Sequence, residues 1–190
     1  MNVMMINIKS LLIVLAFSCA GMYTFGQQDS VSKTPVPVDE NTELIVYKAV
    51  IQEEGTTEEF FKRAVKWINS TYKSPSSVTS LRDMESGKIE GDHRFKIYAT
   101  TKEGVNTEWD TITYKFKLEF RENRYRYTFF DFVIKGQSRY PLEEWLDKMD
   151  ASENGYFEEK LKKVDEYMQN LIASLIESMQ PEKVIVEEDW

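Results

Sequence analysis

The stretch that decides the fold is Trp109–Ile134, WDTITYKFKLEFRENRYRYTFFDFVI. Two runs within it, 109–121 and 124–134, alternate apolar and polar residues on either side of Glu122-Asn123. A tight turn at this dipeptide would oppose Phe120/Tyr125, Leu118/Tyr127, Phe116/Phe129 and Ile112/Val133 on one face, and Arg121/Arg124, Glu119/Arg126 and Lys117/Thr128 on the other. A slip of one residue would mix the two faces, so the pattern predicts an antiparallel hairpin with a well-defined register.

The segments before this hairpin predict further strands and one helix. Residues 44–51, LIVYKAVI, are rich in β-branched side chains and predict a strand. Thr56 and Glu59 form a capping-box pattern ahead of apolar and aromatic residues that recur with a helical period. A short strand over 78–83 and an alternating strand from Lys88 follow. The predicted order is therefore β-α-β-β-β-β.

After Gly136 the pattern becomes helical. Pro141 suits the first turn of one helix, and a longer helix is predicted from about Tyr156 to Gln180. We therefore predict an α+β fold, in which an antiparallel sheet carries helices on one face and continues into a C-terminal helical extension. The expected boundaries are 43–135 for the sheet domain, 140–180 for the C-terminal helices and 181–190 for an acidic tail.

The first 26 residues have the features of a secretory signal peptide. Lys9 precedes the apolar run Leu11–Phe17, which is too short to span a bilayer, and polar residues follow from Gln27. We expect cleavage near Gly26 and export to the periplasm, the outer-membrane surface or the medium. Residues 27–42, polar and interrupted by prolines, are expected to form a flexible tether.

Cys19, the only cysteine of the sequence, lies inside this leader. Lipidation of Cys19 is an alternative to cleavage near Gly26, because Ser18 is the small residue that such a site requires, although Ala16 and Phe17 fit it poorly. We expect membrane attachment only if Cys19 is lipidated. Cleavage would leave a chain without disulfides, thiolate metal ligands or a cysteine nucleophile.

The charge balance narrows the choice of partners. The chain has 24 Lys and Arg against 32 Asp and Glu, a net charge of −8. This charge repels a phosphate backbone, so nucleic-acid binding is not expected unless basic groups gather on one face. The single histidine, His93, together with the loss of Cys19, excludes a His/Cys metal cluster, and no cofactor is predicted.

The pattern of strands with one aromatic helix resembles a family of secreted bacterial domains of unknown function that have a TATA-binding-protein-like fold. The resemblance covers residues 47–134, about half of the chain, and leaves out the C-terminal helices. It implies the fold and a secreted location, and it contributes no catalytic residue. The stretches that carry it are Ile45–Ile51, Glu58–Tyr72 with Trp67-Ile68, the hairpin around Gly87-Lys88-Ile89-Glu90-Gly91, Tyr114–Phe120 and Tyr125–Phe132.

Asp131, Tyr114 and His93 form a candidate buried polar site. The alternation places Asp131 on the apolar face opposite Tyr114, where its carboxylate could act as an acid with a raised pKa or simply accept the tyrosine hydroxyl. We favour the hydrogen bond. His93 falls in phase with apolar neighbours of its strand, which is more typical of a structural histidine than of a catalytic base.

Phe130, Phe132 and Ile134, with Thr113 opposite, form a second candidate site, a ligand or partner face. The same alternation places these aromatic and aliphatic residues on the face away from the first helix, where they need a cover. A second chain or a ligand could provide it, but the C-terminal helices of the same chain are the expected cover.

These features predict an exported binding or structural module of the cell envelope, with an envelope protein or a small ligand as its partner. One alternative is a hydrolase-type enzyme that uses Asp131 and His93 in a pocket between helix and sheet. The other is a homodimer formed through the long C-terminal helix, where residues such as Leu171 and Leu175 form a coiled-coil-like seam. Docking of that helix on its own sheet is preferred, because Ile172 and Ile176 widen the apolar stripe.

Overall fold

The computed structural model describes residues 34–101, 104–136, 138–151 and 155–181. The predicted signal peptide, the first part of the predicted tether and the acidic tail from residue 182 onward lie outside these ranges. Within them, no helix is both long enough and apolar enough to cross a membrane.

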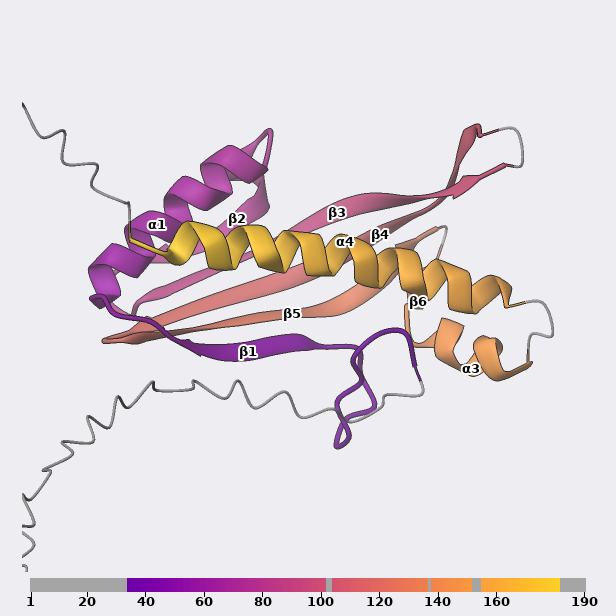
Figure 1. Ribbon diagram of the computed structural model, residues 1–190, viewed down its shortest axis with the longest axis horizontal. Coiled ribbons are helices and arrows are strands. Elements are labelled where there is room, and N and C mark those ends of the chain that lie inside the picture. Colours follow the sequence, from indigo (N-terminus) through magenta and orange to yellow (C-terminus); the bar gives the residue numbers. More distant parts are fainter. Residues whose placement is uncertain (1–33, 102–103, 137, 152–154, 182–190) are drawn as a thin grey trace, which may run out of the picture. The chain divides into compact units, whose positions relative to one another are not determined.

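The described chain forms an antiparallel sheet of six strands with its helices packed against it, which confirms the predicted α+β fold (Figure 1). The strand order is β1-β5-β4-β3-β2. Strand β1 pairs with residues 124–129 of β5, and β6 pairs with residues 133–135 on the same edge of β5. The elements are β1 (Tyr47–Gln52), α1 (Thr57–Thr71), α2 (Pro75–Val78), β2 (Thr79–Asp83), β3 (Lys88–Thr100), β4 (Asn106–Arg121), β5 (Arg124–Lys135), β6 (Arg139–Pro141), α3 (Glu144–Ala151) and α4 (Tyr156–Met179).

The predicted β4–β5 hairpin is present, and its register is as predicted from the turn up to the Phe116/Phe129 pair. The pairing then shifts by one residue, so that Ile112 lies opposite Ile134 instead of Val133. Asn123 in the turn has a φ of +58°, a left-handed conformation that asparagine tolerates. The alternation thus predicts the register from the turn to the point where β5 contains one extra residue.

Helices α1 and α4 cover the same face of the sheet. The predicted capping box is formed, because Thr56 Oγ1 accepts from the Glu59 N–H while the Glu59 carboxylate accepts from the Thr56 N–H. Figure 1 shows α4 running lengthwise over the strands, with its C-terminal end beside α1. There the Arg63 guanidinium donates to the Met179 carbonyl oxygen (2.9 Å), which ties α1 to the end of α4.

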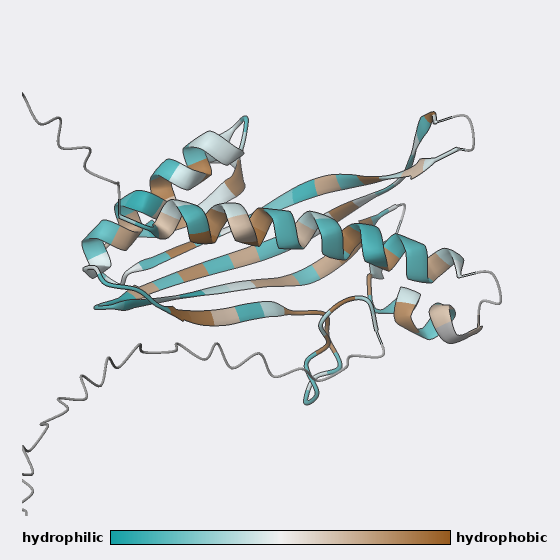
Figure 2. Cartoon of the chain, in the orientation of Figure 1, coloured by the Kyte–Doolittle hydropathy of each residue, from teal (hydrophilic) through white to brown (hydrophobic). Residues whose placement is uncertain are grey.

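The core lies between the helices and the sheet. Brown and teal residues alternate along the strands in Figure 2, as expected when one face is buried and the other is not. The Phe61 and Phe120 rings join α1 to β4 with centroids 5.9 Å apart, and the Phe95 and Tyr167 rings stack at 3.8 Å to join β3 to α4.

Two local predictions were wrong. Pro141 ends strand β6, and α3 begins three residues later, because residues 139–141 pair with the end of β5. Residues 34–42 are not a free tether: Val36 is buried, and Val38 forms an isolated β-bridge with Ile45. These residues therefore belong to the folded domain.

Candidate binding face of the sheet

A β-bulge in β5 determines which side chains reach each face of the sheet. Lys115 pairs with Phe130 and Thr113 with Val133, so the single residue Tyr114 lies opposite both Asp131 and Phe132. Asp131 has a φ of +56°, which is the left-handed conformation of the first residue of such bulges. The extra residue reverses the inward and outward alternation in the rest of β5.

This reversal separates the residues of the predicted partner face. Phe130 and Thr113 do lie half-buried on the open face, which we define as the side of the sheet opposite α1 and α4. Phe132 is instead in the core, with its ring 5.7 Å from Tyr47 and 6.0 Å from Tyr114, and Ile134 packs against the same core. Their placement on the open face was wrong because the bulge was not anticipated.

Asp131 also lies on the face opposite to the predicted one. Its carboxylate forms ion pairs with the ammonium of Lys115 (2.8 Å) and the guanidinium of Arg139, both on exposed side chains. The predicted hydrogen bond to Tyr114 is not formed. Asp131 is therefore a charged group of the open face and not a buried acid.

Tyr114 and His93 lie on the helix side of the sheet. The Tyr114 hydroxyl is 3.1 Å from the Tyr72 hydroxyl, and burial raises the pKa of both phenols. The His93 ring lies 4.7 Å from the Tyr72 ring, edge to face, and burial and then the Arg94 charge lower its pKa. His93 and Asp131 thus point to opposite faces, and the cleft that the hydrolase alternative requires between them is not formed.

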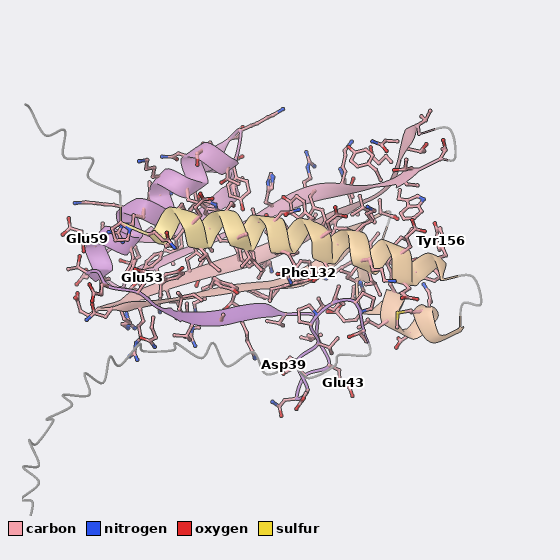
Figure 3. All side chains as sticks on the ribbon, viewed as in Figure 1. Asp39, Glu43, Glu53, Glu59, Phe132 and Tyr156 are labelled. Atoms are coloured by element: carbon pink, nitrogen blue, oxygen red, sulfur yellow. The ribbon has the colours of Figure 1, made fainter. Side chains whose placement is uncertain are left out.

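The open face contains a groove of about 780 Å³ that we call the Phe130 groove. Its apolar lining residues are Leu44, Val46, Phe130, Phe132 and Pro141, from the segment before β1 and from strands β5 and β6, although the Phe132 side chain is 1% exposed and belongs to the core. The groove is bordered by the loop that contains Asp39 and Glu43, which lies away from α1 and α4 in Figure 3. The charged residues that line it are Lys48, Lys117, Arg126, Arg139, Asp39, Glu119, Asp131 and Glu143.

Part of this groove could not be assigned from the sequence. Residues 34–42 were expected to be part of a tether and residues 44–51 a strand, and neither Leu44 nor Val46 was assigned to a candidate face. The described segment is held in place by the Ile45 N–H, which donates to Glu143 Oε1 (2.9 Å), and by the Val46 N–H, which donates to the Pro37 carbonyl. Glu143 is 98 positions away from Ile45, and local pattern does not reveal such a contact.

Basic residues gather on the open face although the chain is acidic. Cross-strand partners share a face, so the register assigns eleven basic and six acidic strand residues to this side, a net of +5 in a chain of −8. Asp39 and Glu143, which line the groove from outside the strands, reduce this to +3. The basic residues are Lys48, Lys88, Arg94, Lys96, Lys115, Lys117, Arg121, Arg124, Arg126, Lys135 and Arg139; the acidic ones are Asp83, Glu90, Asp92, Glu108, Glu119 and Asp131.

The C-terminal helices do not provide the cover that was expected for the open face. In α4, Leu171 and Leu175 are buried in the core on the other side of the sheet, together with Val164 and Met168. The seam proposed for dimerisation is therefore occupied within the chain. In the described part of the molecule, no three His, Cys, Asp or Glu side chains are grouped as metal ligands would be.

Residues 47–135 match the model of a family described as a domain of unknown function (DUF4468) with a TBP-like fold. A DUF4468 family protein from Bacteroides ovatus ATCC 8483 has a similar structure, with a TM-score of 0.63 and 13% identity over 77% of this chain and 91% of that one. A TBP-like protein from Parabacteroides distasonis ATCC 8503 gives a TM-score of 0.61 and 14% identity over 76% of this chain and 97% of that one. These likenesses confirm the TBP-like fold inferred from the sequence. No curated protein matches the chain.

Proposed function

We propose that this chain is an exported binding module that holds an extended, acidic segment of a partner protein in the Phe130 groove. The observation that carries the proposal is a partly apolar groove, lined by four basic and four acidic residues, on a face whose strand residues carry a net charge of +5. Export rests on the leader-like residues 1–26, and the binding role rests on the described domain.

The charge of the open face favours an acidic partner. Lys48, Lys117 and Arg126 line the groove with their charged ends partly in solvent, with side-chain exposures of 57%, 33% and 53%. Cations at the edge of an interface attract an oppositely charged partner and align it, and the apolar centre supplies most of the affinity.

The shape of the groove favours an extended segment. Its volume lies within the roughly 300–1,000 Å³ range of ligand sites. It includes Phe130 and Asp131, which lie between the part of β5 that pairs with β1 and the part that pairs with β6, so that at these two residues β5 has a strand neighbour only on the β4 side. The next carbonyl, that of Phe132, accepts from the Leu142 N–H (2.9 Å). An extended peptide exposes alternate side chains, so that it can place apolar groups on Phe130 and acidic groups beside the surrounding cations.

Fluorescence anisotropy with two labelled peptides tests the proposal. One peptide alternates valine with glutamate, and the other alternates valine with lysine. We expect the glutamate peptide to bind, more weakly at higher salt, and the lysine peptide not to bind. Phe130→Ser should weaken binding, whereas Val50→Ser, which removes an exposed valine outside the groove, should not.

Equal binding of the two peptides, or unchanged binding to Phe130→Ser, would contradict this proposal. Circular dichroism must show that both variants remain folded. If they do, an unchanged affinity of Phe130→Ser means that the groove is not the site.

A further inference from the structure

Three arginines meet at the tip of the β4–β5 hairpin. Arg121 and Arg124 are directly opposed across the two-residue turn, and Arg126 follows on the same face, opposite Glu119. Like charges opposed in this way destabilise a strand pair. The opposition of the two charges does not stabilise the hairpin, so the presence of Arg124 opposite Arg121 requires another explanation.

The acidic residues nearby do not neutralise this cluster. Glu119 accepts from Arg126 Nε (2.8 Å) and Nη2 (2.7 Å) and also lies 3.5 Å from the Lys117 ammonium. Glu122, in the turn itself, is directed to the helix side, where its Oε1 accepts from the Thr57 N–H (3.3 Å). At least two positive charges at the hairpin tip are therefore without a counter-ion among the described residues.

Two of the three guanidinium groups are already held in place. Arg121 Nη1 donates to the carbonyl oxygens of Ser86 (3.2 Å) and Phe120 (3.3 Å), and Arg126 is held by Glu119. The Arg124 side chain forms no hydrogen bond or ion pair with any residue that the structure describes. Its donors are thus available to a ligand that binds between the two fixed neighbours.

A hollow of about 230 Å³ lies between these side chains, lined by Val50, Glu119, Arg121, Arg124, Tyr125 and Arg126. Guanidinium groups form paired hydrogen bonds with phosphate and carboxylate oxygens, and three of them suit a group with two negative charges. We propose that the hairpin tip is a binding site for a phosphate group, with Arg124 as the residue that closes on it.

This site is separate from the proposed groove function. The two share Glu119 and Arg126, but the phosphate site does not require Phe130, and the groove does not require Arg124. Phe130→Ser should therefore leave phosphate binding unchanged, so that failure of one proposal is distinguishable from failure of the other.

Thermal unfolding with inorganic phosphate as the probe tests the site. Phosphate should raise the Tm of the wild-type protein more than sodium chloride at equal ionic strength. Arg124→Gln should bind phosphate about ten- to a hundredfold more weakly, the loss expected for one charged hydrogen-bonding group. Without phosphate at low salt, the same variant should be more stable than the wild type, because the repulsion with Arg121 is removed.

Arg94→Gln is the matched control, since Arg94 lies on the same face opposite the neutral Thr113. It should retain the full phosphate response. Equal responses to phosphate and chloride, or a full phosphate response in Arg124→Gln, would overturn the proposal. So would a loss of stability of Arg124→Gln at low salt, because the pair would then not be repulsive.

The source of the phosphate is distinguished by vesicle sedimentation. Phosphatidylcholine vesicles that contain phosphatidic acid present the same phosphate group on a surface. Sedimentation that requires Arg124 would identify a lipid headgroup as the source, whereas phosphate binding without sedimentation would identify a soluble phosphorylated ligand. Vesicle binding that is unchanged in Arg124→Gln would be non-specific and would count against the site.

Discussion

Lys160 Nζ lies 2.6 Å from Asp110 Oδ2, which joins the first turns of α4 to β4 in a place where only 8% of the lysine side chain is exposed. Burial alone would lower the pKa of Lys160, but the hydrogen bonds that its ammonium makes with Asp110 and Tyr156 outweigh burial, so the pKa is raised and the ammonium stays charged. The rings of Tyr156 (4.4 Å), Trp145 (4.9 Å) and Trp109 (5.7 Å) surround the cation.

Removing one partner of this pair should destabilise the domain strongly. Asp110→Ala leaves a buried ammonium without its carboxylate, and we expect a loss of about 3 kcal/mol in the free energy of unfolding. Urea denaturation measures it. The exposed Lys163–Glu166 pair is the control, and Glu166→Ala should cost less than about 1 kcal/mol. Similar losses in the two variants would show that the aromatic rings, and not Asp110, compensate the charge.

Gly91 has no room for a side chain. A Cβ atom there would lie 2.1 Å from the Val78 carbonyl oxygen and 2.6 Å from Phe116 Cζ. Gly91→Ala should therefore push β2 away from β3, with a loss of about 3 kcal/mol or more in chemical denaturation. Gly136→Ala, where the nearest atom is 3.7 Å away, should have little effect. Equal stability of the two variants would contradict this packing.

The left-handed backbone at Asp131 limits which residues the bulge accepts. Asp131→Asn should keep the bulge, because asparagine tolerates a positive φ, and should lose only the ion pairs with Lys115 and Arg139. Asp131→Val should cost about 1–2 kcal/mol more than Asp131→Asn, since a β-branched residue is strained in this conformation. Chemical denaturation compares the two, and equal losses would mean that the bulge does not depend on residue 131.

The loop before β1 should respond to acid. The hydrogen bond from Lys48, and then the bond from the Asn41 N–H, lower the pKa of Asp39 from its usual 3.8 to about 2. Because this pKa is lower in the folded state, the bonds stabilise the loop above about pH 3.8 and are lost as the pH falls toward 2. An NMR titration should find the Asp39 midpoint near 2 and should find it raised toward 3.8 in Lys48→Met. Lys62→Met serves as the control and should leave it unchanged.

The proposed export predicts the N-terminal residue of the mature chain, and this prediction does not depend on the fold. Intact mass spectrometry of the protein from its native host should find a chain that begins at Gln27, without lipid. A chain that begins at Cys19 and carries acyl groups would mean that the lipoprotein alternative is correct. A chain with its leader intact would contradict export by this route.

The sequence was sufficient to predict the strand register where apolar and polar side chains alternate strictly. It was insufficient where a single extra residue breaks that alternation. Phe116/Phe129 and the pairs nearer the turn were predicted because a slip would expose aromatic rings. The bulge was missed, although the run Phe129-Phe130-Asp131-Phe132 interrupts the alternation and could have indicated it.

The candidate sites were predicted less well because they depend on contacts between distant segments. Helical spacing in α4 predicts an apolar stripe but not the face of the sheet that it covers. The contact between Ile45 and Glu143, which places the wall of the groove, joins positions that share no local pattern. The opposition of Arg121 and Arg124 was predicted from the sequence, but the destabilising effect of two opposed positive charges was not considered.

The strand residues of the open face carry a net charge of +5, and the residues of α1, α3 and α4 carry +1, −2 and −2, which gives the domain a permanent electric dipole across its two layers. A negatively charged partner exerts a torque on such a dipole before any atoms touch, and the torque turns the open face toward it. Part of the orientational search is then completed during diffusion. Charge reversals far from the groove, at Arg94 for instance, should therefore slow association and leave the lifetime of the complex unchanged.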